Sequence, residues 1–230
     1  MNHQPTARSP ELRGLYPIVD LDQLSRLGVD PVLFSEALLQ ARPAIVQVRA
    51  KATPPRDTLQ VLRAVLPRCR AAGAWLFVND RPDLALLADC DGVHVGQEDL
   101  PLHEVRCFAP KLRVGVSTHN LQQLSEALSL RPDYVALGPI FTTVSKLNPD
   151  PVVGVATLSE AHRAARAQGI PLVAIGGLTL ARTLEISECT DMVAVISALL
   201  EGESTPAGGS RVAAEFQALF ARERGSNWVG

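Results

Sequence analysis

The feature of this sequence that most constrains its fold is a regular alternation of short apolar runs with longer segments of helical period. Short runs rich in Val, Ile and Leu are typical of strands buried on both faces, and the segments between them carry apolar residues at three- and four-residue steps. Eight such units can be counted, and 230 residues lie close to the roughly 250 typical of a single-domain (β/α)₈ TIM barrel. We therefore predict an α/β fold of that architecture.

The expected elements can be assigned to residue ranges. The predicted strands are 15–20, 45–50, 75–79, 92–95, 113–117, 134–138, 172–176 and 192–197. The clearest predicted helices are 57–72, 121–130, 158–168 and 211–221. The segment 201–210, rich in Gly and Ser, is interpreted as a simple connector before the last helix. The catalytic barrel domain is expected over 13–224, between flexible tails at 1–12 and 225–230.

An open, doubly wound sheet is the structural rival, because it also alternates strands and helices. In such folds a glycine-rich G-x-G-x-x-G turn commonly follows the first strand. No such turn follows the first predicted strand here. The closed barrel is therefore favoured.

Charge and cysteine content exclude several classes of function. The chain has 22 Lys+Arg and 24 Asp+Glu, a net charge of -2, so it offers no basic surplus for nucleic acid or an anionic membrane. The cysteines at 69, 90, 107 and 189 form no C-x-x-C pair, which argues against a zinc site or a disulfide framework. No apolar run approaches about 18 residues and the first ten residues are polar, so no membrane span or secretory signal is expected. A reduced, cytoplasmic setting fits best.

Polar residues stand where the second predicted strand ends. Catalytic side chains of a TIM barrel come from the carboxyl ends of its strands. Alternate residues of a strand point to one face, so Gln47, Arg49 and Lys51 are expected to project together. Two cations beside an amide suit a polyphosphate. On this motif alone, a solvated strand end is an equally good interpretation.

The next two strands end in carboxylates. Asn79 and Asp80 follow the apolar run 76–78, and Asp99 follows the strand 92–95. Asp80 and Asp99 can then face one Mg²⁺, which prefers a few carboxylates together with substrate phosphate oxygens. The competing interpretation is that these residues form Asx turns or helix caps.

The fifth strand leads into a cluster of hydroxyl and imidazole groups. Ser117 is a candidate substrate contact, whereas Asn120 is better explained as a helix N-cap. His94, inside the fourth strand, is interpreted as a hydrogen-bonded core histidine and is not placed among the candidate catalytic residues.

The last three strands carry features suited to a second anion. The loop 141–153 is long by barrel standards and contains Thr143, Ser145 and Lys146. Gly177 follows the seventh strand and allows close approach of the backbone to a ligand. Phosphate sites in this fold commonly use the loops after strands seven and eight, which points to Gly177, Ile196 and Ser197.

Taken in order, these segments resemble the thiamine phosphate synthase (thiamine-phosphate pyrophosphorylase) family over nearly the full chain. Any one of the segments is unspecific, but six in the same order are not. The segments that carry the resemblance are 47–51 (QVRAK), 78–85 (VNDRPDLA), 91–99 (DGVHVGQED), 115–119 (GVSTH), 138–141 (GPIF) and 174–177 (AIGG).

The resemblance implies a reaction, a metal and a set of residues. The implied reaction joins 4-amino-2-methyl-5-hydroxymethylpyrimidine diphosphate to a thiazole phosphate, giving thiamine phosphate and pyrophosphate with Mg²⁺. Gln47, Arg49, Lys51, Asn79 and Ser117 are the implied pyrimidine and diphosphate contacts, and Asp80 and Asp99 the metal ligands. Thr143, Ser145, Gly177, Ile196 and Ser197 are the implied thiazole phosphate contacts, with Lys146 near the departing pyrophosphate. Arg49, Lys51, Ser117 and Lys146 are the implied catalytic residues.

The chain departs from the family pattern in one loop, and two alternative functions are also open. The family usually shows Pro-Thr-x-Thr-Lys where this chain has Thr-Thr-Val-Ser-Lys at 142–146, which puts the rate in doubt more than the reaction type. A thiazole tautomerase shares the barrel but typically lacks the complete diphosphate and metal set. A barrel that binds thiamine precursors without reaction is the other alternative. Small molecules are the expected partners, and the sequence predicts no oligomeric state.

Overall fold

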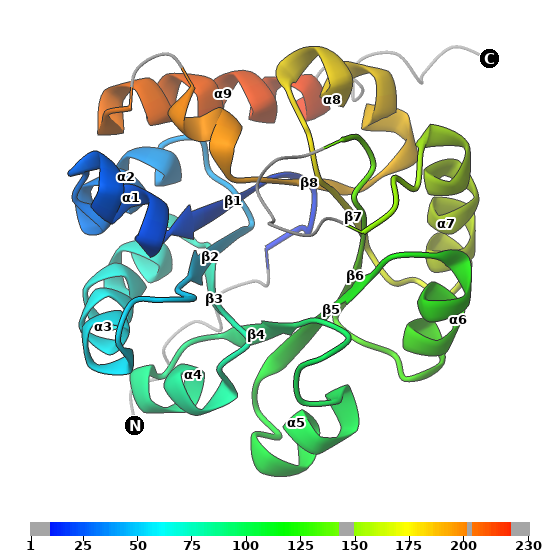
Figure 1. The fold of residues 1–230 in the computed structure, drawn as a ribbon, viewed down its shortest axis with the longest axis horizontal. Helices are drawn as coiled ribbons and strands as arrows, with labels where there is room; N and C mark the ends of the chain where they lie inside the picture. The colour runs from blue at the N-terminus through cyan, green and yellow to red at the C-terminus, as the bar shows by residue number, and fades with distance from the viewer. Residues whose placement is uncertain (1–9, 143–149, 202–203, 222–230) are drawn as a thin grey trace, which may run out of the picture.

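The strands of this protein form a closed barrel. The computed structural model describes residues 10–142, 150–201 and 204–221. Eight parallel strands follow one another around the barrel in chain order, and the last pairs with the first (Figure 1). The predicted (β/α)₈ architecture is confirmed, and the open-sheet alternative is wrong.

The strands begin and end within two residues of the predicted positions. The second, sixth, seventh and eighth strands end one or two residues earlier than predicted. The observed strands are β1 (Gly14–Asp20), β2 (Ile45–Arg49), β3 (Trp75–Asn79), β4 (Gly92–Val95), β5 (Arg113–Thr118), β6 (Tyr134–Leu137), β7 (Leu172–Ile175) and β8 (Met192–Val195).

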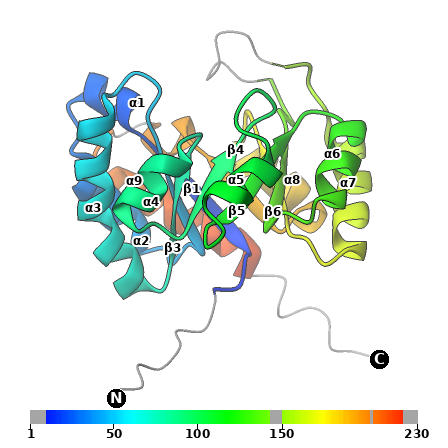
Figure 2. The same cartoon turned by 90° about the horizontal axis from the view of Figure 1, so that it is seen from below.

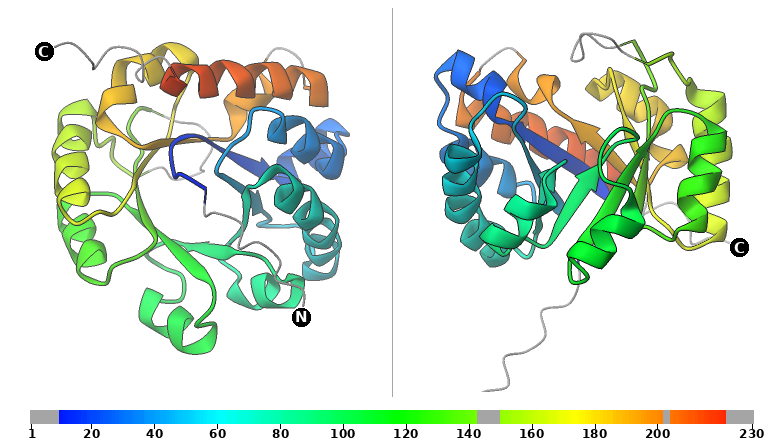
Figure 3. Two further views of the ribbon diagram at one scale, coloured as in Figure 1. Left: turned by 180° about the vertical axis from the view of Figure 1, so that it is seen from behind. Right: turned by 60° about the horizontal axis from the view of Figure 1, so that its bottom comes forward.

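The helices form an outer ring around the strands, as the views in Figures 2 and 3 show from other sides. None in the described ranges is long and apolar enough to cross a membrane. They are α1 (Leu21–Leu27), α2 (Pro31–Leu39), α3 (Pro55–Ala72), α4 (Pro82–Ala88), α5 (Leu102–Phe108), α6 (Leu121–Ser129), α7 (Val155–Ala167), α8 (Leu180–Ile186) and α9 (Pro206–Ala221), with 3₁₀ turns η1 (Ser187–Cys189) and η2 (Ser197–Leu200).

The interpretation of 201–210 as a simple connector is wrong, because α9 already begins at Pro206. Its first turns contain the buried residues Gly208 and Gly209. A Cβ at Gly209 would lie 2.5 Å from Cε2 of Phe34 on α2. Glycine, a poor helix former, is placed here because it lets α9 pack closely against α2.

Apolar side chains form two layers. One fills the space between the helices and the outer face of the barrel, and the other lies inside the barrel. Along β1 the alternation is plain, because Leu15 and Val19 belong to the outer layer whereas Tyr16 and Ile18 belong to the inner one.

Two glycines make room for large rings inside the barrel. Phe77 is paired with Gly92 on the neighbouring strand, and Tyr134 is paired with Gly115. A Cβ on either glycine would overlap the ring beside it. The barrel interior is therefore packed by pairing a large residue with an empty position on the adjacent strand.

Aspartates tie the amino ends of neighbouring strands together. Each precedes an even-numbered strand, and its carboxylate accepts a hydrogen bond of 2.8 Å from a backbone amide at the start of the preceding odd-numbered strand. The pairs are Asp91 with Leu76, Asp133 with Val114 and Asp191 with Leu172. This repeated contact fixes the register at the amino end, so the opposite end is left for chemistry.

We expect Gly115→Ala to destabilise the protein by about 2–3 kcal/mol, because the added methyl group must displace the Tyr134 ring in a packed interior. Gly169→Ala is the control, since Gly169 has a positive φ but open space around its Cβ position, and about 1 kcal/mol is expected there. Urea denaturation measures both variants. Equal losses would show that Gly115 is not needed for packing.

Candidate active site

A cavity of about 880 Å³ opens at the carboxyl ends of the strands. The predicted site residues that the structure describes all line it, namely Gln47, Arg49, Lys51, Asn79, Asp80, Asp99, Ser117, Gly177, Ile196 and Ser197. Thr143, Ser145 and Lys146 lie outside the described residues, and residues 222–224 of the predicted domain do as well. Ten side chains or backbone positions from six strand ends thus meet in one space.

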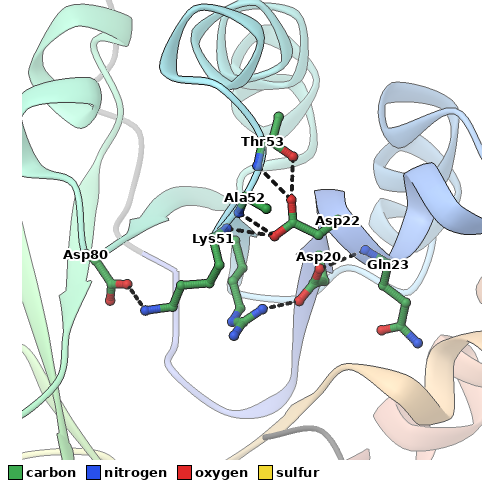
Figure 4. A network of polar contacts seen from close by, with 8 residues as sticks. Asp20, Asp22, Gln23, Lys51, Ala52, Thr53 and Asp80 are labelled. Carbon is green, nitrogen blue, oxygen red and sulfur yellow. Dashed lines mark hydrogen bonds and ion pairs between the residues drawn. The ribbon is translucent and has the colours of Figure 1, made fainter. Parts of the chain in front are cut away.

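The two cations at the carboxyl end of β2 are each paired with a carboxylate, and Figure 4 shows the pair of Lys51 with Asp80. Arg49 makes an ion pair with Asp20, and Lys51 makes one with Asp80. Asp20 also caps α1 by accepting a hydrogen bond of 2.9 Å from the amide of Gln23. The expected common projection of Gln47, Arg49 and Lys51 is confirmed, because all three line the cavity.

Asp22, which sequence reasoning missed, builds the turn that carries Lys51. Its carboxylate accepts hydrogen bonds from the amides of Lys51, Ala52 and Thr53 at 2.8–2.9 Å and from the Thr53 hydroxyl at 2.6 Å. Burial opposes ionisation of Asp22, but these hydrogen bonds outweigh it and lower its pKa to about 2. Asp22 therefore stays ionised and fixes the backbone from which Lys51 projects.

Asp80 and Asp99 come together, as the sequence predicts, and neither caps a helix. Their side chains are in hydrogen-bonding contact, and Asp99 Oδ2 accepts a hydrogen bond of 2.7 Å from the amide of Gly96. Burial and the neighbouring Asp80 raise the pKa of Asp99, against the effect of the Gly96 amide. Two adjacent carboxylates repel each other when both are ionised, and a cation relieves that repulsion.

The donor set at Asp80 and Asp99 fits Mg²⁺. That ion takes oxygen ligands, commonly one or two carboxylates with the remaining positions filled by water and substrate phosphate. Within the described ranges no group of three or more His, Cys, Asp or Glu side chains is arranged to enclose a metal. The pair therefore suits an ion completed by a phosphorylated ligand rather than a closed structural site.

The floor of the cavity is a chain of hydrogen bonds across the barrel. Gln47 Nε2 donates to the Tyr16 hydroxyl at 2.6 Å, and the hydroxyls of Tyr16 and Tyr134 lie 2.7 Å apart. His94 contacts the Tyr134 hydroxyl through Nδ1 at 2.8 Å and Ser117 Oγ through Nε2 at 2.7 Å. His94 is buried and hydrogen-bonded, as predicted, and it also lines the cavity.

Beyond Ser117, the expected role of Asn120 is confirmed. Its side chain accepts a hydrogen bond of 2.9 Å from the amide of Gln123 at the start of α6. Asn120 is therefore a structural residue beside the site.

The glycines after β7 shape the opposite side of the cavity. Gly176 and Gly177 have φ values of +98° and +65°. A Cβ at Gly177 would lie 2.9 Å from the carbonyl oxygen of Phe141, and one at Gly176 would lie 2.5 Å from Cβ of Pro139. The sequence argument assigned close approach at Gly177 to a ligand, but the chain segment after β6 already requires glycine there.

Arg182 is a cation on this side of the cavity that sequence reasoning missed. Its guanidinium donates a hydrogen bond of 2.7 Å to the carbonyl oxygen of Gly177 and lies 5.0 Å from the centre of the Phe141 ring. The backbone amide of Arg182 donates a hydrogen bond of 3.3 Å to the Thr179 hydroxyl, which caps α8. The sequence signal that could have identified Arg182 is its position in the first turn of the helix that follows the Gly-Gly pair.

A smaller cavity of about 200 Å³ opens near the amino ends of β4 and β5. Its charged lining includes Arg70, which makes an ion pair with Asp89 at 2.7 Å, and Asp91, which accepts the strand-end hydrogen bond described above. These groups are engaged in holding the fold, so we assign the candidate active site to the larger cavity.

Comparisons with known proteins agree on one family. A family model described as thiamine monophosphate synthase matches residues 15–199. The thiamine-phosphate synthase of Anaeromyxobacter dehalogenans is 39% identical over 213 residues, which cover 92% of this chain and 91% of that protein. The thiamine-phosphate synthase of Koribacter versatilis is 41% identical over 197 residues, covering 83% of this chain and 90% of that one.

A solved structure gives the same result. The thiamine phosphate pyrophosphorylase from Pyrococcus furiosus superposes with a TM-score of 0.79 and 28% sequence identity, covering 91% of this chain and 96% of that chain. The similarity in three dimensions therefore extends over most of both chains.

We expect Asp22→Ala to lower the free energy of unfolding by about 2 kcal/mol at pH 7, because three backbone amides and the Thr53 hydroxyl lose a charged acceptor. The pKa of Asp22 is lowered from 3.8 to about 2, so its stabilising contribution is complete above about pH 5 and is lost as the pH falls toward 2. Urea denaturation at pH 7, 5 and 3 measures this. Asp30→Ala, which removes the α2 N-cap, is the control.

A difference between native protein and Asp22→Ala that stays constant from pH 7 to pH 3 would contradict this account of Asp22. The Asp30→Ala control should cost about 1 kcal/mol, typical for loss of an N-cap.

Proposed function

The chain belongs to the thiamine monophosphate synthase family, and we propose that it joins a hydroxymethylpyrimidine diphosphate to a thiazole phosphate in the cavity at the carboxyl ends of its strands. It is an enzyme of thiamine biosynthesis. The observation that carries the proposal is that one cavity holds two cationic regions on opposite sides. Arg49 and Lys51 lie on the side of β2, and Arg182 lies beside Gly177 after β7.

The proposed reaction breaks one bond and forms another. The bond between the pyrimidine methylene carbon and the diphosphate oxygen breaks, and pyrophosphate leaves with the electron pair. The lone pair of the thiazole nitrogen forms the new bond to the methylene carbon, giving the thiazolium product. Positive charge at the methylene is tolerated because the aminopyrimidine ring is electron-rich.

In this proposal Arg49 and Lys51 stabilise the leaving diphosphate. Fixed cations aimed at developing negative charge are an efficient form of catalysis, because they need no reorganisation during the reaction. In the free protein Asp20 pairs with Arg49, and Asp22 fixes the backbone from which Lys51 projects. Asn79 and Ser117 are proposed contacts of the pyrimidine diphosphate, and Lys146, from the family resemblance, a further contact of the departing pyrophosphate.

Asp80 and Asp99 are the residues that would hold Mg²⁺. When bound, the ion neutralises charge on the phosphate oxygens of the leaving group. Lys51 pairs with Asp80 in the free protein, and with Asp80 engaged by the ion it would be available to pair with the diphosphate. Gly177, Ile196 and Ser197 are proposed contacts of the thiazole phosphate, where backbone amides and Arg182 supply the donors.

A turnover assay tests the proposed function. Purified protein is incubated with the pyrimidine diphosphate, the thiazole phosphate and Mg²⁺, and thiamine phosphate and pyrophosphate are quantified. Equal amounts of the two products are expected. Isomerisation of the thiazole without condensation would indicate a tautomerase. Binding of both substrates without product would indicate a barrel that binds thiamine precursors without reaction.

For the metal, we expect Asp99→Asn and Asp80→Asn each to raise the Mg²⁺ concentration for half-maximal activity by about tenfold or more, because each removes one anionic ligand. The double variant should lose little beyond the worse single variant, since two ligands of one ion act as a unit. Activity titrated against Mg²⁺ measures this.

Asp83→Asn is the matched control for the metal titration. Asp83 lies near Asp80 in sequence but pairs with Arg81 at 2.5 Å, and its variant should keep the native Mg²⁺ dependence. If both Asp80→Asn and Asp99→Asn also keep it, the paired-carboxylate site is wrong.

For the phosphate of the thiazole, we expect Arg182→Ala to raise the KM for thiazole phosphate by about tenfold or more, as befits loss of a charge-assisted hydrogen bond. The KM for the pyrimidine diphosphate should stay within about twofold. Steady-state kinetics with each substrate varied separately measure both values.

Arg182→Lys should recover part of the affinity, because it keeps the charge but loses the planar guanidinium. Arg163→Ala, on the exposed face of α7, is the control and should behave as the native enzyme. An equal rise in both KM values in Arg182→Ala would instead indicate a general disturbance of the cavity.

A further inference from the structure

The hydrogen-bond chain on the cavity floor connects two positions of the cavity through buried side chains. It runs from Gln47 through Tyr16, Tyr134 and His94 to Ser117, and we call it the relay. The first four residues are at most 8% exposed. Both ends, Gln47 and Ser117, line the cavity. A buried chain that ends twice at the same ligand space can transmit hydrogen-bond polarity from one end to the other.

Only two neutral arrangements satisfy every link of the relay and also use the hydrogen of both phenols within it. A phenol hydroxyl carries one hydrogen, and a neutral imidazole has one N–H and one acceptor nitrogen. A phenol oxygen that accepted from both of its neighbours would leave its own buried hydrogen without an acceptor in the relay, which is costly. Each link must therefore point the same way as the one before it. Burial raises the pKa of both Tyr16 and Tyr134 above the ordinary phenol value, so both hydroxyls keep their hydrogens.

The orientation of the Gln47 amide selects one of the two arrangements. Because Nε2 of Gln47 donates to Tyr16, Tyr16 donates to Tyr134, Tyr134 donates to His94 Nδ1, and His94 Nε2–H donates to Ser117. Gln47 then offers its carbonyl oxygen as an acceptor to the cavity, and Ser117 offers its O–H as a donor. In the reversed arrangement Gln47 offers an N–H donor to the cavity and Ser117 offers a lone pair as an acceptor.

We infer that Tyr134 and Tyr16 are positioning residues that fix this polarity, so that the cavity accepts a 4-aminopyrimidine and rejects its 4-oxo counterpart. The inference rests on the proposed function for the identity of the ligand. An amino group donates to the Gln47 carbonyl, while ring nitrogens or phosphate oxygens accept from Ser117. A 4-oxo ring needs a donor at Gln47, which reverses the relay and removes the donor at Ser117.

The packing of the relay supports a fixed arrangement. The rings of Tyr16 and Tyr134 meet edge to face at 5.6 Å between centroids, and the His94 ring stacks on Tyr134 at the same distance. Gly115, the strand neighbour of Tyr134, leaves the space that its ring occupies. The rings are therefore held by the apolar interior, and a Tyr→Phe change removes a link while keeping the ring.

The kinetic test compares kcat/KM for the 4-amino and 4-oxo pyrimidine diphosphates with thiazole phosphate saturating. The native enzyme should favour the 4-amino substrate strongly. Tyr134→Phe and Tyr16→Phe, which cut the relay at different links, should each reduce that preference by about tenfold or more, because Gln47 can then rotate its amide without affecting Ser117. Because the two variants interrupt the relay at different links, the test stays valid if one of them folds poorly.

Thr118→Val is the matched control. Thr118 is fully buried on the same strand as Ser117, and its hydroxyl donates to the Ala136 carbonyl at 2.9 Å, outside the relay. The variant loses a buried hydrogen bond but should keep the native preference between the two substrates. If both Tyr→Phe variants keep that preference and lose only stability or turnover, the inference is overturned.

A second measurement separates failure of this inference from failure of the proposed function. The protein has five histidines, and ¹⁵N NMR at about pH 8.5, two units above the ordinary histidine pKa, reports the tautomer of each. His94 is identified as the signal lost in His94→Gln. The relay requires a single Nε2–H tautomer in the native protein and a mixture in Tyr134→Phe.

The outcomes are distinct. If the native protein makes no thiamine phosphate, the proposed function fails, and the His94 tautomer alone then decides whether the relay has a fixed direction. An Nδ1–H tautomer or a mixture in the native protein overturns the inference, whatever the activity.

Discussion

Closure of eight parallel strands into one barrel is the constraint on which the rest of this structure depends. Parallel strands share a direction, so every carboxyl end reaches the same mouth, and residues far apart in the sequence become neighbours around one cavity. Aspartates at the amino ends fix the strand pairs there. The chemistry is thereby concentrated at one end, and stability is secured at the other.

The interior of the barrel connects packing to recognition. Pairing Tyr134 with Gly115 fills the core, and the same ring carries a hydroxyl into the relay beneath the cavity. At the rim, Asp20 pairs with Arg49 and Asp22 fixes the backbone that carries Lys51, so the positions of both residues are set in the free protein. Preorganisation of this kind lowers the cost of binding and strengthens electrostatic catalysis.

Sequence patterns predicted the barrel and ten residues of its cavity, because strand periodicity and the position of polar residues at strand ends are local properties. They did not predict two other contacts between distant residues. Tyr16 and Tyr134 are 118 positions apart, and Asp22 contacts Lys51 from 29 positions away. The start of α9 was mistaken for the same reason, since its glycines are explained only by Phe34 on another helix. Metal ligation and the roles of Thr143, Ser145 and Lys146 stay predictions.

A crystal structure of the protein with thiamine phosphate, pyrophosphate and Mg²⁺ tests the central claim most directly, which is that both substrates meet in the cavity at the carboxyl ends. Our account expects pyrophosphate against Arg49 and Lys51 with the ion at Asp80 and Asp99. It expects the phosphate of thiamine phosphate on the opposite side, beside Gly177 and Arg182. Ligands bound at the amino-end cavity, or with these two anions exchanged, would contradict the account.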